Sequence, residues 1–371
     1  MKAGIVGLPN VGKSTLFNCL SNTKAQSANF PFCTIEPNHS IINVPDKRLI
    51  TLQEIVNPEK LIPATVEIVD IAGLVKGASK GEGLGNKFLA NIRETDAIIH
   101  VLRCFDNDNI THVDGSVDPI RDKEIIDIEL QLKDLESLNN RLEKVSRTVK
   151  SGDKEAAREK EVLNQAISFI ESSNNIRSID LDEDDINKYL KPLQLITSKP
   201  VLYVCNVDER SVTSTNSYVE SVKSLISDEG ANLIVLAAGI ESEINELEDY
   251  EERRMFLDDL GLDEPGSSKL ISATYDLLNL HTYFTAGPKE VRAWTIPKMA
   301  TAPQAAGVIH TDFEKGFIKA EVIAFEDYVK YQTEAKVKEA GKMRVEGKLM
   351  WLIMVTLFTF YLMFRIPDCI S

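Results

Sequence analysis

The start of the chain joins a short apolar strand pattern to a glycine-rich loop and a helix pattern. Residues 2–6 lead directly into Gly-Leu-Pro-Asn-Val-Gly-Lys-Ser-Thr at 7–15, which contains G-x-x-x-x-G-K-[ST]. In this motif the glycines let backbone N–H groups face one anion, Lys13 reaches the terminal phosphates, and the Ser14 hydroxyl ligates Mg²⁺. The helix pattern that follows adds its positive N-terminal end to the site. The sequence therefore predicts a strand–loop–helix unit that binds a nucleoside triphosphate.

The acidic balance of the chain limits its partners. The chain has 371 residues and a formal net charge of −15, so long-range repulsion opposes general binding to nucleic acid, although a local basic face remains compatible. The 5 cysteines are scattered without a C-x-x-C pair, which favours buried free thiols in a reducing cytosol, with Cys33 in a polar loop as the exception. No signal-peptide pattern precedes the first strand. We expect a cytoplasmic protein that does not bind DNA directly.

Hydrophobic patterning predicts an α/β domain interrupted by a helical hairpin. Continuous apolar runs at 64–69 and 97–102 are typical of a buried parallel sheet. Apolar residues then recur at helical spacing over 128–149 and, after a Ser-Gly-Asp break, over 154–172, which predicts two antiparallel helices. A strand pattern resumes at 200–206, so the hairpin is an insertion rather than a tail.

These changes of pattern predict five segments. They are a first part of the nucleotide-binding domain (1–122), a helical hairpin (123–198), a second part of the nucleotide-binding domain (199–279), a small mostly β domain (280–348) and an anomalous apolar tail (349–371).

The predicted tip of the hairpin carries a basic cluster in an otherwise acidic protein. Its members are Arg141, Lys144, Arg147, Lys150, Lys154, Arg158 and Lys160. Glutamates at helical spacing from them favour a solvated face with intrahelical ion pairs. A docking surface for a polyanionic partner is the alternative, and the sequence leaves both open.

Two further elements of a GTPase-like site follow the phosphate loop. Asp70-Ile-Ala-Gly73 comes directly after an apolar run, where Asp70 would hold a Mg²⁺-bound water and the Gly73 N–H would face the γ-phosphate. Thr34, in the polar segment 29–36, is the best candidate for a threonine that reaches Mg²⁺.

The position after Gly73 is Leu74, which can neither donate nor accept a hydrogen bond to orient water. Another group must therefore position the attacking water. The candidates are the backbone, the glycine-rich segment 77–85, and His112 in a polar loop after the strand pattern at 98–102. We expect the glycine-rich segment to move with nucleotide state, because glycines absorb large φ/ψ changes.

The base-reading segment departs from the guanine pattern Asn-Lys-x-Asp. The equivalent position holds Asn206-Val-Asp-Glu209, so the lysine stem that covers the base and the aspartate that pairs with guanine are both replaced. Discrimination for guanine is therefore expected to be weak. A preference for adenine is compatible with this segment, although geometry does not require it.

Several motifs together closely resemble the YchF subfamily of Obg-like P-loop NTPases. They lie at 7–15, 29–35, 70–77, 103–105, 116–119, 206–209, 310–317 and 320–322, and the resemblance runs from the first residue to about 348. It implies an α/β fold: a P-loop NTPase domain of the Ras-like type with an inserted helical hairpin, followed by a TGS-type β-grasp domain. It also implies a cytosolic ATPase that tolerates GTP, hydrolyses slowly, binds ribosomes and takes part in stress responses.

The resemblance also assigns roles to matching positions. The phosphates would be held by Asn10, Val11, Gly12, Lys13, Ser14 and Thr15. The nucleotide site would continue with Asn206, Val207 and Glu209, with the Val207 backbone touching the base. Mg²⁺ would be bound by Ser14, Thr34 and Asp70. His112 matches the proposed catalytic histidine of the family and would act with Lys13 and Gly73, and Asn10 is a candidate K⁺ ligand.

The end of the chain departs from the family pattern, which closes with an acidic β-hairpin. Residues 349–364 are instead almost entirely apolar. One interpretation is a membrane anchor, but the run is shorter than the ~20 residues that span a bilayer. A terminus rewritten by a shifted reading frame is the interpretation we favour, and it leaves the last strands of the β domain uncertain.

The leading hypothesis is a slow Mg²⁺-dependent ATPase that acts as a conformational switch on the ribosome. One alternative is a GTP-reading ribosome assembly factor whose hydrolysis is incidental. The other is a membrane-associated nucleotide switch that uses the apolar tail.

Overall fold

The computed structural model describes residues 1–22, 38–71, 84–113, 115–150, 152–247, 249–348 and 356–361. It divides into two compact units. One unit comprises Met1–Ile42 and Glu67–Leu278, and the other comprises Asn43–Val66 and Asn279–Ser371. This division differs from the predicted segments in one place. Residues 43–66 belong to the C-terminal unit, because the short strand Lys60–Ile62 pairs with a strand at 290–292.

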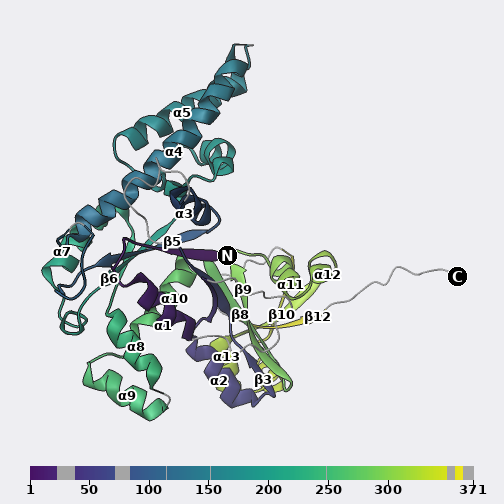
Figure 1. The fold of residues 1–371 in the computed structure, drawn as a ribbon. Helices are drawn as coiled ribbons and strands as arrows, with labels where there is room; N and C mark the ends of the chain where they lie inside the picture. Colours follow the sequence, from purple (N-terminus) through teal and green to yellow (C-terminus); the bar gives the residue numbers. More distant parts are fainter. Residues whose placement is uncertain are drawn as a thin grey trace. The chain divides into compact units, whose positions relative to one another are not determined.

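The first unit is built on a six-stranded sheet in the order β2-β4-β1-β5-β6-β7 (Figure 1). The strands are β1 (Lys2–Val6), β2 (His39–Asn43), β4 (Thr65–Asp70), β5 (Ala97–Arg103), β6 (Val201–Asn206) and β7 (Asn232–Leu236). Every neighbouring pair among β4, β1, β5, β6 and β7 is parallel. All residues of β5 and β6 are buried, as expected for central strands covered by helices on both faces.

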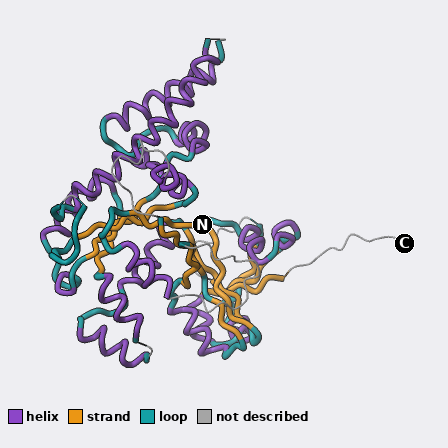
Figure 2. The backbone as a smooth tube through the Cα atoms, viewed as in Figure 1, coloured by secondary structure: helices purple, strands orange, loops and turns teal. Residues whose placement is uncertain are grey.

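The helices of the first unit follow the α/β pattern predicted from the sequence (Figure 2). The helices described in this unit outside the insertion are α1 (Lys13–Asn22), α3 (Leu84–Arg93), α7 (Ser217–Ile226), α8 (Ala238–Glu246), α9 (Tyr250–Asp259) and α10 (Gly266–Leu277). The phosphate-loop motif lies between β1 and α1, at the carboxyl end of a central strand. This is the edge of a parallel sheet where ligands bind.

The helical insertion consists of a long helix, α4 (Pro119–Val149), and its partner, α5 (Lys154–Glu171). Asp118 and Asp153 cap the two N-termini by accepting bonds from backbone N–H groups. Between the helices lies an apolar core that includes Leu138, Leu163 and Ile170. Short helical turns, including α6 (Glu183–Asp185), then return the chain to β6.

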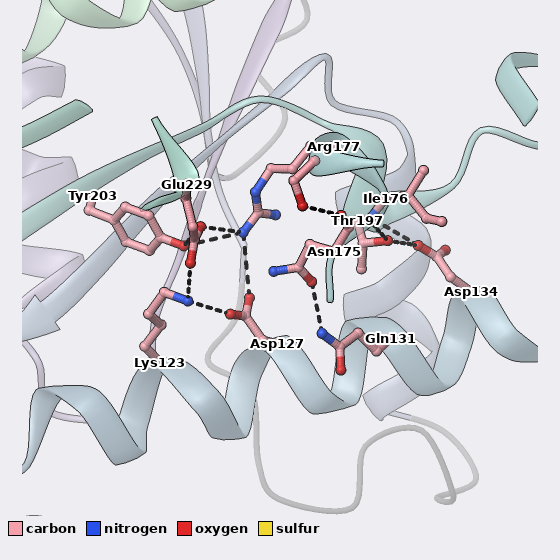
Figure 3. A network of polar contacts seen from close by, with 11 residues as sticks. Lys123, Asp127, Gln131, Asp134, Asn175, Ile176, Arg177, Thr197, Tyr203 and Glu229 are labelled. Carbon is pink, nitrogen blue, oxygen red and sulfur yellow. Dashed lines mark hydrogen bonds and ion pairs between the residues drawn. The ribbon is translucent and has the colours of Figure 1, made fainter. Parts of the chain in front are cut away.

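The root of α4, where the hairpin joins the sheet, buries charges rather than hydrocarbon (Figure 3). Lys123 Nζ lies 2.7 Å from Asp127 Oδ2 and 2.6 Å from Glu229 Oε1. Arg177 donates to the other carboxylate oxygen of Glu229 at 3.0 Å, and the Tyr203 hydroxyl donates to the same oxygen at 3.0 Å. The network therefore ties α4 and the returning segment to strand β6.

A second group in the same region fastens the end of the insertion. The fully buried Asp134 accepts bonds from the backbone N–H groups of Ile196 (2.8 Å) and Thr197 (2.7 Å) and from the Thr197 hydroxyl (2.7 Å). Because the root of α4 is polar, two residues of the predicted apolar stripe stay exposed: Ile128 by 50% and Leu132 by 39%. The predicted helical insertion is confirmed, but its apolar stripe is buried only beyond the root of α4.

The second unit contains a six-stranded sheet in the order β11-β10-β12-β8-β9-β3. Its strands are β3 (Lys60–Ile62), β8 (Leu280–Ala286), β9 (Glu290–Pro297), β10 (Lys319–Ala324), β11 (Arg344–Glu346) and β12 (Thr356–Tyr361). Its helices are α2 (Lys47–Val56), α11 (Ala302–Ile309), α12 (Thr311–Lys315), α13 (Phe325–Tyr331) and α14 (Glu334–Glu339). Tyr283, Phe317 and Val322 lie in a core between the sheet and α11.

Part of the apolar tail enters this sheet as strand β12. It runs antiparallel to β10 from Lys319↔Tyr361 to Ala324↔Thr356, and it pairs in parallel with β8 at Leu357↔Phe284. The backbone of 356–361 is thus extended and not helical, which opposes a membrane-spanning helix through 349–364. Among the residues that the structure describes, no helix combines the length and the apolar character needed to cross a membrane.

Candidate nucleotide-binding site

The phosphate loop has the backbone geometry that its glycines predict. Gly12 has φ +93°, in the left-handed region, and a Cβ there would lie 2.1 Å from the side-chain nitrogen of Asn206. Asn10 also has a positive φ, of 65°. The first turn of α1 is closed by a 2.9 Å bond from the Leu16 N–H to the Gly12 carbonyl. Only glycine therefore fits at position 12, both for its conformation and for its contact with Asn206.

Lys13, the first residue of α1, and Asp70, the last residue of β4, form an ion pair. Their side chains are only 9% and 15% exposed. The structure thus brings together the cation predicted to reach the terminal phosphates and the carboxylate predicted to hold a Mg²⁺-bound water. Ser14 and Thr15 directly follow Lys13 in the first turn of α1, and both are exposed. This arrangement fits a Mg²⁺–triphosphate group, whose opposite charges would separate Lys13 from Asp70.

Ser14 and Asp70 are the two predicted Mg²⁺ ligands that lie within the described residues. In the described ranges, no cluster of three or more His, Cys, Asp or Glu side chains could form a protein cage for a metal. Mg²⁺ is commonly bound through one or two protein groups together with substrate phosphates. Two predicted residues of the site, Thr34 and Gly73, lie outside the described residues, as do Leu74 and most of the segment 77–85.

Asn206 links the phosphate loop to the base-side segment. Its side-chain nitrogen donates to the Val11 carbonyl at 2.9 Å, and its side-chain oxygen accepts from the Ala238 N–H at 2.9 Å. The residue is 4% exposed, so both bonds are shielded from water. Asn206 therefore holds the phosphate loop and the start of α8 together.

The other base-side residues differ in which of their polar groups are already hydrogen-bonded within the protein. The Val207 N–H donates to the Leu236 carbonyl at 2.9 Å, so a contact of the Val207 backbone with a base would have to come from its carbonyl. Asp208 uses its carboxylate to accept from the Ser211 N–H at 2.9 Å. Glu209 is exposed at the start of the following turn.

His112 is not an exposed loop residue. It is 6% exposed, and its Nε2 lies 2.8 Å from Asp122 Oδ2 in the first turn of α4. The other carboxylate oxygen of Asp122 lies 3.0 Å from the Arg121 guanidinium. The preceding residue reaches the phosphate loop, because Asn10 Nδ2 donates to the Thr111 carbonyl at 3.0 Å. The loop of His112 therefore contacts the phosphate loop, while the His112 side chain is held by α4.

Sequence reasoning assigned no role in the site to Asp122 or Arg103, although both contact the His112 loop. Asp122 is in the first turn of α4, where an acidic residue usually complements the helix dipole. Arg103 ends β5 with its guanidinium buried in the loop that follows. Two sequence signals could have identified Arg103: its charge at the end of a mostly apolar strand and its place in the motif at 103–105.

Comparison with known proteins confirms the family resemblance. Residues 2–144 match a family model described as a 50S ribosome-binding GTPase, and 280–353 match the YchF-GTPase_C model, described as a protein of unknown function (DUF933). The chain is 56% identical over 347 residues to the ribosome-binding ATPase YchF of Haemophilus ducreyi, covering 94% of this chain and 95% of that protein. It is 54% identical over 350 residues to the protein of the same name from Bacillus subtilis, with the same coverage. The structure of the Schizosaccharomyces pombe YchF GTPase superposes with a TM-score of 0.88 at 38% identity and 97% coverage of both chains.

Proposed function

Because the chain belongs to the YchF family of Obg-like P-loop NTPases, we propose that it is a Mg²⁺-dependent ATP hydrolase that binds the ribosome in the cytoplasm. It would act as a slow nucleotide-dependent switch that modulates translation or a stress response. The observation that carries the proposal is the phosphate loop with its Lys13–Asp70 pair and its Asn206 link to the base side.

We assign the phosphates to the loop from Asn10 to Thr15 and Mg²⁺ to Ser14, Thr34 and Asp70. Gly73 would face the γ-phosphate. The Asn10 amide nitrogen donates to the Thr111 carbonyl, and a K⁺ ion would be bound by the Asn10 amide oxygen. K⁺ at that position stays a prediction.

Weak discrimination between ATP and GTP follows from the base side. Guanine is recognised by a carboxylate that accepts from its two adjacent donors, but Asp208 uses its carboxylate to cap a turn and Glu209 carries the longer side chain. The relatives described above are named ATPases, which supports the ATP assignment. The match to a ribosome-binding GTPase model supports the second candidate, a GTP-reading assembly factor.

Competition binding separates the two candidates. We expect unlabelled ATP to displace a fluorescent ATP analogue at a concentration equal to or below that of GTP, with phosphate release that stops when Mg²⁺ is chelated. If GTP instead binds tenfold or more tightly than ATP, the ATPase assignment is wrong and the GTP-reading candidate replaces it.

The hairpin tip is our candidate for the ribosome contact. All three arginines of the basic cluster have acidic partners: Arg141 lies 2.6 Å from Glu159, Arg147 pairs with Glu143, and Arg158 contacts Asp185 and Glu161. Lys144 and Lys150 are exposed and form no ion pair with the residues that the structure describes. These two lysines, like the exposed Lys154 at the start of α5, are therefore available to ribosomal RNA phosphates.

Co-sedimentation with ribosomes tests the tip. Replacing Lys144 and Lys150 by glutamine is expected to weaken binding about fivefold and to reduce the slope of log K against log salt by about 2. The control exchanges two other exposed lysines, Lys47→Gln with Lys269→Gln, for the same change in net charge. Equal behaviour of both double variants would return the cluster to an ordinary solvated face.

A further inference from the structure

The side chain of Arg103 is directed into the loop that joins β5 to α4. Arg103 is 1% exposed, and its guanidinium donates to three backbone carbonyls: Phe105 at 3.1 Å, Asn107 at 3.2 Å and Ile110 at 2.9 Å. The guanidinium carbon also lies 4.7 Å from the centroid of the Phe105 ring. One side chain thus contacts the loop at three separated points.

The partners of Arg103 are unusual for a buried cation. Its guanidinium takes part in no ion pair with a carboxylate in the ranges described by the structure. A buried charge is costly unless hydrogen bonds replace its hydration, so the three carbonyls must converge on the guanidinium for the folded state to tolerate it. The planar fork of arginine matches three acceptors spread around it, whereas a lysine ammonium is a compact point charge. Arg103 therefore specifies the path of the loop backbone.

Other contacts hold the same loop, one from outside and one within it. The Tyr218 hydroxyl donates to Asp106 at 3.1 Å, and the Asn109 N–H donates to the Asn107 side chain at 2.9 Å. The chain that leaves this loop bonds the phosphate loop through the Thr111 carbonyl and then supplies His112. A shift of the loop would therefore move both the contact with Asn10 and the position of His112.

We propose that Arg103 is a positioning residue for nucleotide hydrolysis, one that sets the Phe105–His112 loop so that His112 can act beside the phosphate loop. The proposal rests on the proposed ATPase function. Arg103 itself touches no nucleotide in this scheme. Its effect reaches the reaction through the loop backbone, so its loss should lower turnover and leave nucleotide binding nearly unchanged.

A double-mutant cycle tests this coupling. We expect Arg103→Lys to lower kcat for ATP about tenfold while KM changes less than threefold, and His112→Ala to lower kcat at least as much. In the His112→Ala background, adding Arg103→Lys should cost less than twofold, because the residue that the loop positions is already gone. Arg177→Lys, which alters the other buried guanidinium near α4, is the control for a general loss of stability and should lower Tm without this pattern.

A milder variant keeps the test informative if Arg103→Lys does not fold. Phe105→Leu retains the guanidinium but removes the ring beneath it, and we expect a two- to fivefold loss of kcat that also disappears in the His112→Ala background. Losses that multiply in either double variant would overturn the proposal, as would wild-type turnover in His112→Ala alone. A wild-type protein that does not hydrolyse ATP would instead refute the proposed function, so the two failures are distinct.

Discussion

Replacing Lys13 by alanine is expected to reduce ATP hydrolysis about 100-fold or more and to weaken binding of the triphosphate. Lys13 lies in the first turn of α1 and is 8% exposed, so its ammonium acts where water screens it little. Removal of one preorganised charge or donor from a reacting oxyanion typically costs 10²–10³ in rate. Phosphate release under single-turnover conditions and titration with a fluorescent ATP analogue measure the two effects.

Because Lys13 is paired with Asp70, the Lys13→Ala variant should also change in thermal stability. Lys13→Ala leaves a largely buried carboxylate without its partner, so the variant should also unfold at a lower temperature. Adding Asp70→Asn should restore Tm but not hydrolysis. Lys47→Ala, at an exposed lysine that begins α2, is the matched control and should change neither property. Hydrolysis within threefold of wild type in Lys13→Ala would remove Lys13 from the catalytic set.

The phosphate loop could be predicted from the sequence because all its determinants are contiguous. Gly12 must adopt a positive φ and must lack a Cβ, and the motif encodes both requirements in one residue. The same holds for the long helices of the insertion, whose apolar spacing is local. Local patterns of this kind were therefore sufficient to predict the fold class that the structure confirms.

Contacts between distant residues could not be predicted in this way. Asn206 meets Val11 across 195 positions of the chain, and nothing in its own neighbourhood indicates that bond. His112 in a polar loop suggested an exposed side chain, but Asp122 at the start of α4 buries it. The polar residues at the root of α4 have the spacing of a solvated face, and only the fold places Glu229 and Arg177 opposite them.

Sheet membership was also beyond local patterns. Lys60–Ile62 is a short strand inside a segment assigned to the nucleotide-binding domain, yet its partner is β9, far along the chain. The apolar tail lacks the alternation of apolar and polar residues that is typical of a half-exposed strand. A strand with neighbours on both sides does not need that alternation when both of its faces are covered. Its backbone between β10 and β8 gives 356–361 a place in the centre of the second sheet.

Arg177→Leu is expected to destabilise the first unit by about 3–5 kcal/mol, since breaking a buried ion pair leaves an uncompensated charge. Arg177 and Glu229 have side chains that are only 13% and 23% exposed, and Arg177 also donates to the Tyr203 hydroxyl at 3.3 Å. Urea unfolding followed by circular dichroism at pH 7 measures the loss. The matched control is Arg158→Leu, since Arg158 also contacts two carboxylates but is 47% exposed, and we expect a much smaller loss there because water screens its ion pairs.

The stability lost in Arg177→Leu should also depend on pH. Burial raises the pKa of Glu229, but its contacts with Lys123 and Arg177 outweigh burial and lower that pKa below its ordinary value of 4.5. A carboxyl whose pKa is lowered by folding adds stability above its unfolded pKa and loses it as the pH falls through the folded value. The stability gap between wild type and Arg177→Leu should therefore narrow when unfolding is repeated below pH 4.5. A gap that is below 1 kcal/mol at pH 7, or that does not change with pH, would show that the root of the hairpin is not held by these charges.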